Sequence, residues 1–195
     1  PDTTDGYNIV MVGCLCTNFS ISAETGADGG LYKWSATISS GQKPIVNNAQ
    51  TPAGTVYSVA PISLNTCTTA TTVNSVASTV LNGFSVTIDS PAVYAGFSAT
   101  GYDTFARAPE LSVTATAKVK YDSVTRGILA NFNTQPVHDA AGMLTLTQAT
   151  PTHCSILLPS GVLTNAALSE GDIMMLDIEI KAVNVGGNII SFDLA

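Results

Sequence analysis

Apolar and polar residues alternate along several segments of this chain, and this period of two constrains the fold more than any other feature. In "PELSVTATAKVKYDS" (residues 109–123), the odd positions from Leu111 to Tyr121 are apolar and the even positions are polar. Successive side chains of a β-strand point to opposite faces, so this pattern predicts a strand with one buried face. Its other face carries Ser112, Thr114 and Thr116 before the first charge, Lys118. The segment therefore predicts a strand whose second face is polar, small and nearly uncharged.

The same alternation predicts two antiparallel strand pairs. Residues 18–22 ("NFSIS") and 31–39 ("LYKWSATIS") alternate, and residues 26–30 between them supply the glycines that a tight turn requires. Residues 83–89 ("GFSVTID") alternate as well, and we expect them to pair with residues 109–121. In the segment "LYKWSATIS" the residues expected on one, apolar face are Tyr32, Trp34, Ala36 and Ile38.

A third hairpin is expected near the C-terminus. Residues 171–183 ("GDIMMLDIEIKAV") alternate, and "NVGGN" predicts a turn into residues 189–195 ("IISFDLA"). The polar face of this hairpin carries Asp177, Glu179 and Lys181. We therefore expect that face to meet ordinary solvent or a charged neighbour.

One α-helix is expected at about residues 123–132, with Asp122 or Ser123 as its N-cap. Residues at helical spacing give it an apolar side: Val124, Ile128, Leu129 and Phe132. A short helical turn is also expected near Asn165 to Leu168. The chain therefore reads as mostly antiparallel β with one flanking helix.

Composition limits the function. The 195 residues suit a single domain, with a long loop at residues 40–61. Only 11% of residues are charged, against about 25% in typical soluble domains. Seven basic and fourteen acidic residues give a net charge of −7, which argues against tight binding to DNA or RNA. The same charge is compatible with a surface past which DNA slides without sticking.

Residues typical of catalysis or metal binding are sparse. His138 and His153 are the only histidines, and there is no G-x-S-x-G motif or Gly-rich phosphate loop. If Cys14 and Cys16 share a strand, their β-carbons are too far apart for a disulfide. We expect all four cysteines to be structural: Cys14, Cys16, Cys67 and Cys154. The sequence predicts no enzyme, no metal or other cofactor, and no small-molecule substrate.

The loop at residues 40–61 is polar and broken by three prolines. A loop of this length is usually functional or disordered. We expect it and residues 1–7 to contact neighbouring copies of the chain, the alternative being a surface insertion. Several of its apolar residues would be exposed in a lone monomer and are candidates for an interface between subunits: Val46, Val56, Tyr57 and Val59.

The segment "LNGFSVTIDSPAVY…GYDTFARAPELSVTATAKVKYDS" and the helix after it resemble major tail tube proteins of long-tailed bacteriophages, and "GCLCTNFSIS" with "GLYKWSATI" looks like the first hairpin of that family. The resemblance implies a β-sandwich flanked by a helix. It also implies homo-hexameric rings that stack into a tube for genome delivery, with lumen-lining strands shared between subunits and other tail proteins as partners. Such a protein is made in the host cytoplasm and resides in the virion tail, and Pro1 would suit a cytosolic chain that has lost its initiator Met.

The resemblance suggests a role for the Ser/Thr strand faces. Hydroxyl groups with scattered acids attract phosphates far less than lysines do, so they suit a channel through which DNA passes. The expected lumen-facing residues are Ser20, Ser22, Ser85, Thr87, Asp89, Ser112, Thr114 and Thr116. Such faces could instead be buried between subunits or simply solvated. Other readings of the whole chain are a capsid or decoration jelly roll, a secreted adhesin or pilin-like module, and a glycan-active enzyme on a β-sandwich.

Overall fold

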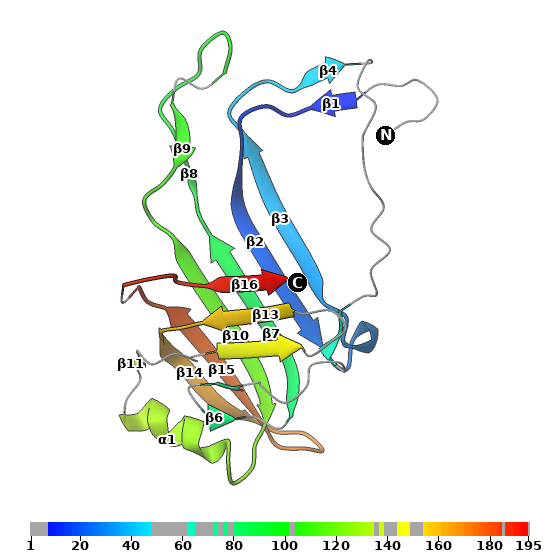
Figure 1. Cartoon of the computed structure of the whole chain (residues 1–195), viewed down its shortest axis with the longest axis vertical. Helices are drawn as coiled ribbons and strands as arrows, with labels where there is room; N and C mark the ends of the chain where they lie inside the picture. The colour runs from blue at the N-terminus through cyan, green and yellow to red at the C-terminus, as the bar shows by residue number, and fades with distance from the viewer. Residues whose placement is uncertain are drawn as a thin grey trace. The chain divides into compact units, whose positions relative to one another are not determined.

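The computed structural model describes residues 8–47, 62–64, 72–73, 76–77, 80–101, 104–134, 137–138, 144–148, 154–184 and 186–194. Strands dominate these residues, with one α-helix (Figure 1). The chain forms two compact units. The first comprises Pro1–Phe19, Ala36–Val59 and Asp89–Leu111, and the second comprises Ser20–Ser35, Ala60–Ile88 and Ser112–Ala195. The single domain expected from the sequence stays a prediction.

Two short antiparallel ribbons belong to the first unit. One pairs β1 (Asn8–Val10) with β4 (Ile45–Asn47), so the start of the expected loop at residues 40–61 is a strand, and residues 48–61 lie outside the described part. The other pairs β8 (Ala92–Tyr94) with β9 (Phe105–Arg107), and the Tyr94 and Phe105 rings stack at 5.1 Å.

Seven strands form the larger sheet, in the order β11-β14-β15-β10-β7-β2-β3. Their bounds are β2 Cys14–Glu24, β3 Lys33–Ser40, β7 Leu81–Asp89, β10 Ser112–Lys120, β11 Val137–His138, β14 Gly161–Ser169 and β15 Met175–Ala182. This order confirms that β2 neighbours β3 and that β7 neighbours β10. The turn between β2 and β3 contains a 3-10 turn, η1 (Asp28–Gly30), in which Gly29 and Gly30 have positive φ, as the sequence predicts.

A second sheet has the order β16-β13-β12-β5-β6. Its strands are β5 Thr72–Val73, β6 Val76–Ala77, β12 Leu144–Gln148, β13 Cys154–Leu158 and β16 Ser191–Leu194. The hairpin expected at the C-terminus is wrong, because β15 lies between β10 and β14, and β16 pairs with β13. The helical turn expected near Asn165 to Leu168 is wrong for a related reason: these residues are part of β14, which pairs with β15 from Gly161 to Ser169.

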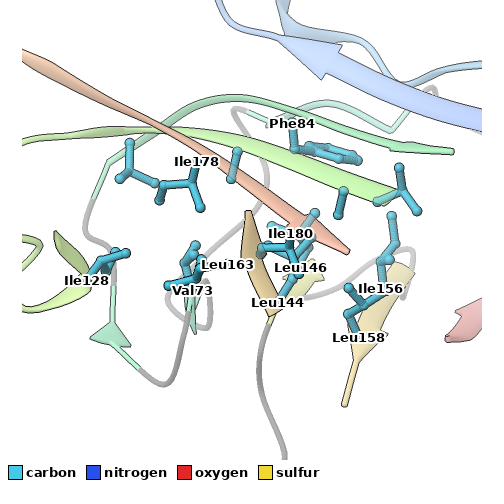
Figure 2. Close-up of a cluster of buried hydrophobic side chains, with 14 of the residues drawn as sticks. Val73, Phe84, Ile128, Leu144, Leu146, Ile156, Leu158, Leu163, Ile178 and Ile180 are labelled. Atoms are coloured by element: carbon cyan, nitrogen blue, oxygen red, sulfur yellow. The ribbon is translucent and has the colours of Figure 1, made fainter. Parts of the chain in front are cut away.

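The hydrophobic core of the second unit lies between the two sheets. The larger sheet contributes alternate residues of β10 and β15, such as Val113, Ala115, Ile178 and Ile180, which are almost completely buried. Figure 2 shows side chains of the second sheet and of the helix within the same cluster: Val73, Leu144, Leu146, Ile156, Leu158 and Ile128. Two antiparallel sheets with one buried face each, and a helix beside them, confirm the β-sandwich with a flanking helix.

Helix α1 (Arg126–Thr134) begins later than expected, and Asp122 caps the turn before it. The Asp122 carboxylate accepts hydrogen bonds from the backbone N–H groups of Val124 and Thr125, both at 2.9 Å. These backbone donors hold the pKa of Asp122 below its ordinary value of 3.8. Thr125 is buried and donates its hydroxyl to the Lys120 carbonyl at 2.8 Å, which ties the turn to the end of β10. Val124, expected on the apolar side of the helix, precedes it and is exposed.

Replacing Asp122 by Ala removes the acceptor from two backbone donors, so we expect a lower melting temperature. Asn at this position keeps an acceptor and serves as the matched control. The folded-state pKa of Asp122 is depressed, so its negative charge stabilises the folded protein at pH values above the unfolded-state pKa. This stabilisation is lost as the pH falls through the folded-state pKa. The difference in melting temperature between wild type and Asp122→Asn should therefore shrink on acidification. A difference that stays constant with pH would contradict a stabilising role of the Asp122 charge, whereas an unchanged melting temperature of Asp122→Ala would contradict the cap.

The core position Leu146, 1% exposed, offers a test of the sandwich. Leu146→Ala should lower the free energy of unfolding by about 2–5 kcal/mol, because it leaves a cavity between the sheets. The same substitution at Leu111, which is 43% exposed, should cost about 0.5 kcal/mol or less. Denaturant titration followed by circular dichroism measures both, and equal losses would argue against the core described above.

Candidate functional site

Seven of the eight residues expected to face the lumen lie on three neighbouring strands of the second unit. On β10, Val113, Ala115, Ala117 and Val119 are buried, so the residues between them point away from the core. On β7, Phe84 and Val86 are buried, and on β2 the core side holds Ile21 and Ala23. The residues brought onto the opposite face of the sheet are Ser20, Ser22, Ser85, Thr87, Ser112, Thr114 and Thr116.

Asp89, the eighth of these residues, belongs to the first unit. It is the exposed last residue of β7, and its carboxylate accepts a hydrogen bond from the Asn18 side-chain amide. The next residue, Ser90, is buried, and its backbone N–H donates to the Thr17 carbonyl at 2.9 Å. This acid is therefore held in place by the neighbouring strand.

Strand β15 extends the polar face with charged residues. The register of β10 and β15 sets Thr114 opposite Lys181, Thr116 opposite Glu179, and Lys118 opposite Asp177. The Lys118 ammonium lies 3.9 Å from the Asp177 carboxylate, and both side chains are partly exposed. We call these charged residues and the seven Ser/Thr residues together the polar face. The hydroxyl-rich face expected for β10 is thus bordered on one side by the charged residues of β15.

A hollow of about 530 Å³ lies on the polar face. Ser85 and Thr116 line it together with Gly83, where an added Cβ would lie 3.1 Å from the Ala23 carbonyl oxygen. Charged side chains of both signs also line it: Glu24, Lys33, Lys118, Asp177 and Glu179. Cross-strand placement of opposite charges neutralises much of the local field, so this part of the surface is wet, polar and close to balanced in charge.

The expected interface residues are only partly described. Val46 on β4 is 65% exposed and lies opposite Ile9 on β1, which is 71% exposed. Val56, Tyr57 and Val59 lie outside the described residues, as do residues 1–7. Whether these residues contact another subunit stays a prediction.

Sequence reasoning missed a further exposed apolar surface on β3. Trp34 and Ile38, expected on the apolar face of this strand, are both exposed. Among the described strands, β3 is the last in the order of the larger sheet, so its side chains have a described neighbouring strand on one side only. Alternation shows which residues share a face but gives no sign that a strand lies at an edge.

Few cysteine and histidine residues lie in the described ranges. No group of three or more His, Cys, Asp or Glu side chains there could hold a metal ion. Cys14 and Cys16 are free thiols, and the Cys16 thiol donates to the Asn18 carbonyl at 3.3 Å. Cys67 and His153 lie outside these ranges, whereas His138 is in β11 and Cys154 begins β13. The helices that the structure describes are too short or too polar to cross a membrane.

Comparison with known proteins gives these features a context. The sequence model of the phage tail tube protein family matches residues 1–182 of this chain. A search of curated protein sequences finds no match. The matched segment includes the β2–β3 and β7–β10 strand pairs and helix α1, which carry the resemblance noted from the sequence. This protein is a structural component of the tail tube in the virion tail, and it belongs to the phage tail tube protein family.

Proposed function

We propose that this chain assembles into homo-hexameric rings that stack into the tail tube, and that the polar face lines the channel through which DNA leaves the virion. The observation that carries this proposal is the collection of seven hydroxyl side chains on β2, β7 and β10, all opposite the core. A structural role without catalysis, cofactor or small-molecule substrate fits this surface. The other partners are the remaining proteins of the tail.

The charges on the polar face are compatible with DNA passage. Around the hydroxyl groups, Lys118 lies beside Asp177, and Lys181 is two residues from Glu179 on β15. A lysine that already pairs with a carboxylate gains less binding free energy from a DNA phosphate, because the phosphate must compete with that carboxylate. DNA would therefore move along this wall without tight binding.

Strands shared between subunits can close such a channel. Among the described strands, β3 lies at one end of the seven-stranded order, and at the other end β11 pairs with β14 through Val137↔Val162 and His138↔Gly161. Both ends of the larger sheet thus offer backbone groups to a neighbouring copy. We propose that the exposed Trp34 lies at this contact, and that Val46, Val56, Tyr57 and Val59 contribute to the surfaces between subunits.

Negative-stain electron microscopy of the purified protein tests assembly directly. We expect rings or tubes, with six-fold symmetry in end-on class averages. Another symmetry would contradict the hexamer alone. Persistently monomeric particles over a wide range of concentration and salt would contradict self-assembly.

Added lysines test the placement of the channel. Thr114 is a poor position because a lysine there would face Lys181. We therefore choose Thr87 on β7 and Ser112 at the start of β10. Thr87→Lys/Ser112→Lys should leave DNA packaging intact and slow ejection, because repeated positive charges hold phosphates, and added salt should relieve the defect.

The matched control is Thr87→Gln/Ser112→Gln, which adds similar length without charge and should eject DNA at the normal rate. Ejection is followed by DNA release from purified particles. Normal ejection by confirmed lysine-variant particles would rule out a channel role for this face.

A further inference from the structure

One group of exposed apolar side chains outside the polar face belongs to the second unit. Its side chains are between 45% and 61% exposed: Val80, Val124, Leu168, Ile173 and Met174. Backbone hydrogen bonds connect the segments of Val80 and Met174 to the end of β10, because Lys120 N–H donates to the Val80 carbonyl and Tyr121 N–H donates to the Met174 carbonyl, both at 3.0 Å. Leu168 lies on β14, which pairs with β15. We call this set of five residues the end patch.

The β1–β4 ribbon of the first unit is a second apolar surface. The register pairs Ile9 with Val46 and Val10 with Ile45, so apolar side chains lie on both of its faces. Three of these four side chains are more than half exposed: Ile9, Ile45 and Val46. An isolated two-stranded ribbon is marginally stable in water, and this ribbon is only three residue pairs long. Its apolar faces need a cover.

We propose that the end patch of one copy binds the β1–β4 ribbon of a second copy. This inference rests on the proposed self-assembly and identifies two of the surfaces that carry it. A contact between different surfaces of identical chains is heterologous: each copy offers one ribbon and one patch, so the contact propagates from copy to copy instead of stopping at a dimer. Propagation of this kind is what a stacked tube requires.

Charge supports this choice of partner. The turn between β14 and β15 places Glu170 and Asp172 next to Ile173 in the end patch. Among residues 36–47, which include the ribbon strand β4, Lys43 is the only charged residue. A ribbon approaching the end patch therefore brings a cation to two acids, whereas two ribbons facing each other would bring Lys43 to Lys43. The end patch also has cations nearby, because Lys120 and Arg126 lie close to Val124 in the sequence. Two end patches could therefore pair acids with cations, and the experiment must exclude this patch-to-patch contact.

Complementation between two variants distinguishes these arrangements. The ribbon variant Ile9→Ser/Val46→Ser keeps an intact patch, and the patch variant Ile173→Ser/Met174→Ser keeps an intact ribbon. Each variant alone should need a protein concentration on the order of tenfold higher to assemble, because apolar anchors at the centre of a contact carry most of its affinity. An equimolar mixture should form particles of twice the mass of either variant alone and no longer ones, because the joined pair presents only mutated surfaces.

Analytical ultracentrifugation measures these masses, and circular dichroism melts verify folding. The matched controls Val93→Ser and Val183→Ser change exposed apolar residues elsewhere and should assemble like wild type. A charge pair avoids apolar substitutions altogether: Lys43→Glu and Glu170→Lys/Asp172→Lys should each weaken assembly, most strongly at low salt, and their mixture should restore a contact between the two variants.

Normal tubes from either serine variant would overturn the ribbon–patch contact while leaving the proposed tube intact. A mixture whose mass stays that of the separate variants would overturn it as well, in favour of a contact between like surfaces. A wild-type protein that stays monomeric throughout would count against self-assembly itself, and with it against this contact.

Discussion

The burial of one face of the seven-stranded sheet is the constraint on which the rest of this structure depends. Alternate residues of β7, β10 and β15 pack against the five-stranded sheet and leave almost no exposed surface on that side. Because the side-chain period of a strand is two, every residue between them must point outward. The arrangement of hydroxyl and charged groups on the polar face therefore follows from the packing of the core, and a shift of one residue in any strand would exchange the two faces.

Local features of this fold could be predicted from the sequence, and pairings between distant segments could not. Alternation correctly gave the face of Ser85, Thr87, Ser112, Thr114 and Thr116, and the glycines correctly marked the turn between β2 and β3. Alternation could not show that β15, some sixty residues further along the chain, lies beside β10. Loop length and side-chain period allow several strand orders, and the choice among them depends on how whole sheets cover one another.

The expectations from the sequence that proved wrong share a physical cause. Residues 189–195 alternate suitably for a hairpin with β15, but β14 already occupies that side of β15, so the chain continues into the other sheet as β16. Trp34 has the pattern of a buried residue, yet it lies on a strand at the edge of the sheet. For a protein that assembles with its own copies, a sequence pattern typical of burial in the monomer can describe burial between subunits equally well.

The late position of β14, β15 and β16 in the sequence has a consequence for the synthesis of this protein. A chain grown only to residue 160 contains β10 but not the strand that covers its second edge, so neither the large sheet nor the complete core can form. Pairing between such distant segments is slow, because a long loop must close before the contact stabilises it. Folding is therefore completed after most of the chain has left the ribosome. Surfaces that depend on β14 and β15 therefore form only after these last strands have been made.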